Sequence, residues 1–258
     1  MAHEQSFALF AVFMLMIAYG MYRTYIKGKL PHIRRLPALE AIDEGIGRAL
    51  ETGAKVHFGV PNADLARYAP ATLLALTLMG YVAKKAAKAG VPALYTVSSP
   101  RALVIAEAVV REAYTSEGKL EDYENPEKVN VRYLGMGETA YPLALANLLQ
   151  REKIATSVLS GFVGKNMLFL GESHREADTF SVLIYPEVDK VEFGVATFDY
   201  VLMAQEAYAA GALITKDKAQ LGSIIGSDMI SWTTIALVIV FLIIASVLGI
   251  PTKKFLVG

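Results

Sequence analysis

VNVRYLGMGETAYPLALANLLQREKIATSVLSGF, residues 129–162, reads as a strand, a helix and a second strand in succession. Short runs rich in β-branched or aromatic residues, 129–134 and 155–162, flank an amphipathic stretch, 139–152. Two strands joined through a helix are typical of a parallel pair, because a parallel connection must cross back over the sheet. The stretch therefore predicts an α/β fold.

The same alternation continues on both sides of this unit. The other predicted elements are strand 55–60 with helix 71–89, strand 92–97 with helix 100–115, helix 165–176, strand 180–185 with helix 189–197, and strand 199–203 with helix 204–214. Six strands, each followed by a helical segment, predict a Rossmann-like three-layer domain whose parallel sheet is covered on both faces. The acidic stretch 116–127, which Pro126 interrupts, is expected to be a surface loop.

One further helix is expected ahead of the first strand. It follows Pro37, ends near Gly53, and repeats apolar residues every four positions, at Ala38, Ile42, Ile46 and Leu50. This amphipathic pattern predicts a helix lying along the surface of the domain or of a membrane.

Both ends of the chain carry uncharged apolar runs. The run 229–252 has 24 residues, and at about 1.5 Å per residue a helix of that length crosses a bilayer core of about 30 Å. The run 5–22 has 18 residues, and no Lys or Arg precedes it, which favours a retained anchor over a cleaved signal peptide. The run 68–83 is shorter and is expected to be a core helix, the alternative being a third span.

These runs divide the chain into four predicted parts. They are a transmembrane helix at 5–26, a basic linker and amphipathic helix at 27–54, a Rossmann-like domain at 55–222, and a second transmembrane helix at 229–252. Seven basic residues flank the spans on the domain side, and Lys253 and Lys254 lie beyond them. The positive-inside rule therefore predicts a cell-membrane protein with a cytoplasmic domain and both termini outside.

Composition excludes several classes of function. Lys and Arg total 25, as do Asp and Glu, so the chain lacks the basic excess of nucleic-acid-binding proteins. Cysteine is absent, which excludes disulfides, thiolate nucleophiles and cysteine-based zinc sites. The absence of cysteine, with few Gln and Asn, is compatible with a thermophilic source.

Candidate ligand contacts follow the predicted strands, because ligands of open α/β sheets bind beyond the carboxyl ends of the strands. The selected residues are Asn62, Ser99, Arg101, Gly135, Gly137, Glu138 and Thr139. A wider polar rim adds Asp64, Ser98, Ser160, Lys165, Asn166, Glu187, Gln205 and Glu206. The alternative interpretation is that these side chains cap helices without any ligand.

No motif completes a catalytic, metal or cofactor site. The stretch from Gly135 to Ala140 matches G-x-G-x-x-A, yet it follows the third strand rather than the first, and Glu138 brings a negative charge. The stretch 161–166 departs from a Walker A loop, and Arg175 stands where a nucleophile elbow needs its second glycine. The four histidines have no metal-ligand spacing. We therefore expect no catalytic residue, no metal and no cofactor.

Three stretches resemble an uncharacterised prokaryotic family of membrane-anchored proteins. They are 41–58, 131–153 and 198–228. The resemblance implies a Rossmann-like domain of unknown function between two transmembrane helices, and it carries no catalytic residue.

These features favour a self-associating scaffold held in the lipid bilayer as a homo-oligomer. Two helices rich in small residues, 83–90 and 204–212, could pack against neighbouring copies. The alternative is a membrane-tethered sensor that binds a small anionic or nucleotide-like ligand at the carboxyl edge of the sheet. A lipid-related enzyme is the third possibility.

Overall fold

The computed structural model of the protein describes residues 2–26 and 35–247. The chain forms two compact units. One contains the first and last helices, α1 (Ala2–Tyr25) and α10 (Lys218–Val247), and the other contains every element from α2 to α9.

The larger unit is built on a sheet of six parallel strands, in agreement with the predicted α/β fold. The strands are β1 (Lys55–Val60), β2 (Ala93–Val97), β3 (Val129–Tyr133), β4 (Ile154–Ser160), β5 (Phe180–Tyr185) and β6 (Tyr200–Met203). Their spatial order is β3-β2-β1-β4-β5-β6. This is a Rossmann-like order. From β1 the chain adds β2 and β3 on one side, then crosses back to place β4 on the other side of β1, followed by β5 and β6.

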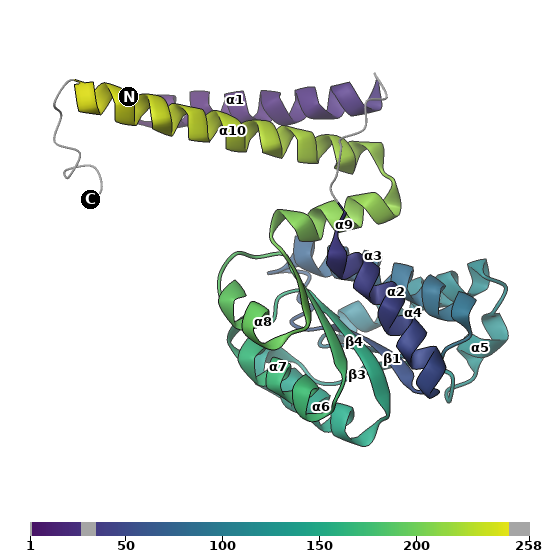
Figure 1. The fold of residues 1–258 in the computed structure, drawn as a ribbon. Coiled ribbons are helices and arrows are strands. Elements are labelled where there is room, and N and C mark those ends of the chain that lie inside the picture. The colour runs from purple at the N-terminus through teal and green to yellow at the C-terminus, as the bar shows by residue number, and fades with distance from the viewer. Residues whose placement is uncertain (1, 27–34, 248–258) are drawn as a thin grey trace. The chain divides into compact units, whose positions relative to one another are not determined.

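Helices cover both faces of this sheet (Figure 1). One face carries α2 (Pro37–Thr52), α3 (Ala69–Ala89), α4 (Pro100–Ser116) and α9 (Gln205–Thr215), and the other carries α6 (Gly137–Arg151), α7 (Met167–Glu176) and α8 (Val191–Thr197). Successive residues of a strand point to opposite faces, so Val56 and Phe58 enter the first core while His57 enters the second layer.

Helix α2 differs from the prediction, because it is an integral layer of the domain rather than a surface helix. Ala38, Ile42 and Ile46 are buried between α2 and the sheet. Leu50 is 58 % exposed, and Ala49 is buried in its place. A repeat of four residues turns by about 400°, so it drifts off a face that recurs every 3.6 residues.

Other elements refine the predicted layout. Helix α3, whose apolar run could have been a third span, is buried against the sheet. The expected loop 116–127 contains a short helix, α5 (Leu120–Glu124).

The two small-residue segments expected to face neighbouring copies are used inside the domain. Ala83, Ala86 and Ala87 of α3 are buried in the core, as are Ala207 and Ala210 of α9. A Cβ atom on Gly211 would lie 2.5 Å from Leu74 Cδ1, which shows how closely α9 and α3 approach. Small residues are therefore needed here for internal packing.

The smaller unit is an antiparallel pair of helices. A Cβ atom on Gly20 of α1 would lie 2.5 Å from the Gly222 carbonyl oxygen, and one on Gly226 would lie 2.6 Å from Ile17 Cα. Within the described residues, one helical stretch, Lys218–Val240, is long and apolar enough to cross a membrane. Helix α10 begins well before the predicted start of the second span, while 248–252 and the linker residues 27–34 lie outside the described residues.

Candidate functional site

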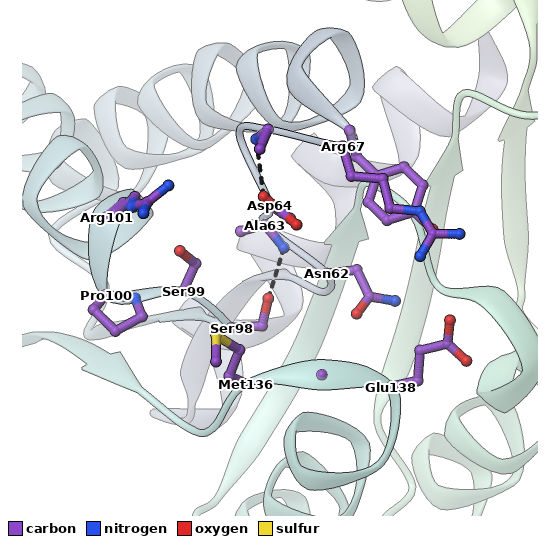
Figure 2. A pocket seen from close by; sticks show the side chains of 13 residues that line it. Asn62, Ala63, Asp64, Arg67, Ser98, Ser99, Pro100, Arg101, Met136 and Glu138 are labelled. Carbon is purple, nitrogen blue, oxygen red and sulfur yellow. Dashed lines mark hydrogen bonds between the residues drawn. The ribbon is translucent and has the colours of Figure 1, made fainter.

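The candidate site is a cavity of about 570 Å³ at the carboxyl edge of the sheet (Figure 2). Three connections line it: 62–68 after β1, 98–101 after β2 and 136–138 after β3. The cavity therefore lies over the half of the sheet formed by β1, β2 and β3.

Hydrogen bonds hold the first connection in place. The backbone N–H of Ala63 donates to Ser98 Oγ over 2.6 Å, which ties this loop to the end of β2. Within the loop, the N–H of Ala66 donates to Asp64 Oδ1 over 2.8 Å. Asn62 has a positive φ of 45°, a conformation that Asn tolerates better than most residues. The wall formed by this loop is thus fixed before any ligand arrives.

The second connection opens helix α4 and leaves polar groups available. Ser99 is the N-cap residue, yet its side chain makes no capping hydrogen bond. The residue is only 9 % exposed and lines the cavity. The first N–H groups of a helix lack partners within the helix. Pro100 occupies the first position of α4, and Arg101, which follows it, lines the cavity.

The third connection explains the G-x-G-x-x-A pattern. Gly135 and Gly137 have φ values of 136° and 92°, which side chains rarely adopt. A Cβ atom on Gly135 would also lie 3.1 Å from Ala140 Cβ. Both glycines are therefore required by the turn from β3 into α6, whether or not a ligand binds.

The structure brings together most of the residues predicted from the sequence. Five of the seven line the cavity, namely Asn62, Ser99, Arg101, Gly137 and Glu138. Gly135, in the turn after β3, and Thr139, in the first turn of α6, do not line the cavity. Of the wider rim, Asp64 and Ser98 line the cavity. Ser160 ends β4 and Lys165 follows that strand, in the other half of the sheet.

Among the lining residues that sequence reasoning missed, two have large polar side chains, Arg67 and Tyr68. They stand just before α3, several positions beyond the end of β1, so counting from the strand end did not reach them. The interval between β1 and α3, residues 61–68, was the available signal, because it is longer than the roughly two to six residues usual for such a loop, and binding residues are common on loops.

Aromatic side chains fill the crevice at the carboxyl ends of β1 and β4, where the strand order reverses. The rings of Tyr68 and Phe162 are nearly parallel with centroids 4.3 Å apart, and Tyr185 lies 6.2 Å beyond Phe162. Tyr68 follows β1 and Phe162 follows β4, so the stack spans these two strands. Dinucleotides bind at this crevice in Rossmann folds, and here the chain's own side chains lie in it.

A second polar cluster lies in the interior, on the α6–α7 face of the sheet. His57 Nδ1 and His174 Nε2 lie 2.7 and 2.8 Å from Ser157 Oγ. His57 Nε2 lies 2.8 Å from Thr96 Oγ1, which is 2.7 Å from the Tyr141 hydroxyl. All five residues are fully buried. The cluster has no open face for a substrate, and we assign it a structural role.

Burial keeps both histidines neutral. Desolvation, followed by the nearby His174, lowers the pKa of His57 to about 3. Desolvation lowers the pKa of His174 to about 4, partly opposed by its hydrogen bond to the Leu170 carbonyl and by Asp199. Across the described residues, no group of three His, Asp or Glu side chains is arranged to hold a metal ion.

Comparison with known proteins identifies one family. A family model described as "Domain of unknown function (DUF6754)" matches residues 2–256. No curated protein and no solved structure matches the chain.

Proposed function

This chain belongs to the DUF6754 family, and we propose that it is a membrane-tethered module that binds a small ligand at the carboxyl edge of its Rossmann-like sheet. The observation that carries the proposal is the cavity over β1, β2 and β3, into which three connections bring polar side chains. Ligands of open α/β sheets occupy this edge.

Thermal stabilisation of the full chain in lipid nanodiscs tests ligand binding. A ligand that binds only the folded state raises the midpoint of unfolding as its concentration rises. We expect hits from a library of sugars, nucleosides, carboxylates and phosphorylated compounds. Ala66→Trp places a large ring in the cavity and should abolish the stabilisation.

The matched control is Ala108→Trp, which adds the same ring at an exposed position of α4 away from the cavity. It should leave every hit intact. A library without hits, or hits that survive Ala66→Trp, would contradict a ligand site in this cavity.

We further propose that α1 and α10 form a two-helix anchor in the cell membrane, with the domain in the cytoplasm and both termini outside. The length and hydropathy of Lys218–Val240 support one span. The close glycine contacts between the helices and the uncharged run 5–22 support the second. Small residues of this kind allow helix backbones to approach closely within a bilayer. Cysteine accessibility from each side of the membrane tests the topology.

Self-association is the second candidate function, and a different surface supports it. Helices α7 and α8 expose four large apolar side chains, Leu168, Phe169, Phe193 and Val195. An apolar patch of this kind is typical of an interface between proteins. We propose a contact between copies of the chain here. Light scattering in detergent should then give a mass above one copy, reduced by Phe193→Glu. A wild-type chain of monomeric mass would remove this candidate.

A further inference from the structure

We infer that the ligand presents a phosphate monoester, and that the phosphate lies at the Ser99–Arg101 end of the cavity, against the first turn of α4. The inference rests on the proposed ligand-binding function and specifies the chemistry of the group that is bound.

The first observation is the unused hydroxyl of Ser99. Ser is a preferred N-cap residue because its oxygen accepts a hydrogen bond from the first turn of the helix. Here the side chain makes no such bond, although the residue is more than nine-tenths buried. Figure 2 shows the oxygen of Ser99 on the side of Arg101. The residue lines the cavity, so an atom of a ligand bound there can replace solvent as the partner of this hydroxyl.

The second observation is the set of donors around that hydroxyl. The first-turn N–H groups of α4 have no side-chain cap, and a helix N-terminus favours an anion. Arg101 lies on the same side of the cavity as Ser99 (Figure 2). A guanidinium, a hydroxyl and backbone N–H groups are donors that match the several acceptor oxygens of a phosphate.

The acidic groups of the cavity set the orientation of the ligand. Glu138 lies on the opposite side, together with Asn62 and Arg67 (Figure 2). The carboxylate and the amide are suited to hydroxyl groups of the ligand, so the phosphate lies away from Glu138. Asp64 is the other carboxylate of the lining, and its Oδ1 already accepts from the N–H of Ala66.

The test is binding of inorganic phosphate, ribose 5-phosphate and ribose to the full chain in phosphatidylcholine nanodiscs. We expect saturable binding of both phosphate compounds and none of ribose at the same concentrations. Arg101→Ala should weaken phosphate binding by about tenfold or more, since hydrogen bonds between charged groups are among the strongest. Ser99→Ala should weaken it several-fold.

Two further variants test the phosphate assignment even if Arg101→Ala or Ser99→Ala folds poorly. Asp64→Asn removes a negative charge and retains an acceptor for Ala66 N–H, so it should tighten phosphate binding several-fold. Arg111→Ala removes a charge from the exposed far end of α4 and should change nothing. Equal effects of Arg101→Ala and Arg111→Ala, or no effect of Asp64→Asn, would overturn the phosphate assignment.

Phosphate could come from a metabolite or from a lipid headgroup, and a second arm separates these sources. Part of the phosphatidylcholine is replaced by phosphatidate, and the affinity for ribose 5-phosphate is measured again. A lower apparent affinity that Arg101→Ala abolishes assigns the phosphate to lipid, and an unchanged affinity assigns it to a metabolite. Absence of phosphate binding, with unphosphorylated hits that Ala66→Trp abolishes, would overturn the phosphate assignment and leave the proposed function standing.

Discussion

The two buried histidines belong to a hydrogen-bond chain that has one direction. The Leu170 carbonyl can only accept, so His174 Nδ1 carries the proton and its Nε2 accepts from the Ser157 hydroxyl. Ser157 Oγ then accepts from His57 Nδ1–H. His57 Nε2 accepts in turn from Thr96, which accepts from the Tyr141 hydroxyl. Every member is satisfied only while both rings are neutral.

This chain of hydrogen bonds predicts that the protein loses stability in mild acid. The folded-state pKa values of His57 and His174 are about 3 and about 4, whereas an unfolded histidine titrates near about 6.5. Below that value the unfolded state takes up protons that the folded state cannot. The stabilisation is therefore complete above about pH 6.5 and is lost as the pH falls toward about 3 to 4. Between pH 8 and 5 the free energy of unfolding should fall by about 4 kcal/mol for the pair.

Denaturant unfolding of the full chain in detergent at several pH values measures this loss. His57→Gln serves as the comparison, because it removes one titrating group. Its slope of unfolding free energy against pH should be about half that of the wild-type chain, whatever its absolute stability. A profile that is flat from pH 8 to 5 would contradict the neutral pair.

The histidine pair shows what the sequence could not reveal at this scale. His57 and His174 are far apart in the chain and have no metal-ligand spacing. The pairing of β1 with β4 places His57 beside Ser157, and the packing of α7 on the sheet brings His174 to the same hydroxyl. Asn62, Ser99 and Arg101 were predictable because each lies within a few residues of the end of a strand. Position after a strand is a local property, whereas contact across the sheet is not.

Helix α2 offers a matched test of packing at the level of one element. A Cβ atom on Gly45 would lie 2.4 Å from Thr156 Cγ2 on β4, and one on Gly47 would meet nothing within 4 Å. Gly45→Ala should therefore destabilise the domain by about 1–3 kcal/mol through overpacking. Gly47→Ala should stabilise it by about 0.5–1 kcal/mol, because alanine favours the helix.

Thermal unfolding of the two variants measures these opposite shifts. The same side chain is added to the same helix two residues apart, so helix propensity contributes equally to both. Destabilisation by both variants would show that α2 tolerates no addition, and stabilisation by both would show that α2 does not approach Thr156 as described.

Helices and strands were predicted well where local signals agree, and less well where tertiary packing decides. The runs before Gly90 and after Ser99 carry their own stop and start signals, and α3 and α4 lie close to the predicted ranges. Helix α5 was missed, because three of its five residues are acidic and none of the five is buried. The placement of Leu50 on the apolar face of its helix was wrong, because a four-residue repeat does not stay on one helix face.

The glycine contacts between α1 and α10 predict a loss of close packing when they are filled. Gly222 and Gly226 lie one turn apart on α10 and face α1 near Met21 and Ile17. Leucine at both glycines should move the helix axes apart by roughly 2–3 Å, since helices with larger side chains at the contact pack about 8–10 Å apart.

Spin labels on cysteines introduced at Tyr19 and Ser223 can follow this distance, because the chain has no cysteine of its own. The double leucine variant should shift the distance distribution outward and broaden it. Thr234→Leu, at an exposed position of α10, is the control and should leave it unchanged. An unshifted distribution in the double variant would contradict the contact between these helices.

For the whole molecule, the connectivity restricts how the domain can be tethered. Helices α1 and α10 are antiparallel, so the carboxyl end of α1 and the amino end of α10 lie at the same end of the pair. All elements from α2 to α9 are inserted between those two points. If the pair spans a bilayer, the whole domain, and with it the ligand cavity, lies on one side of that bilayer.

That arrangement makes a prediction for single cysteines placed in the cysteine-free chain. His3→Cys lies near the amino end of α1, and Glu107→Cys lies at an exposed position of α4 in the domain. A membrane-impermeant maleimide should label His3→Cys in intact cells and Glu107→Cys only after permeabilisation, because basic residues flank the spans on the domain side. The reverse pattern would show the opposite orientation. Labelling of both from one side would show that α1 does not cross the membrane, and the domain would then depend on α10 alone for its anchor.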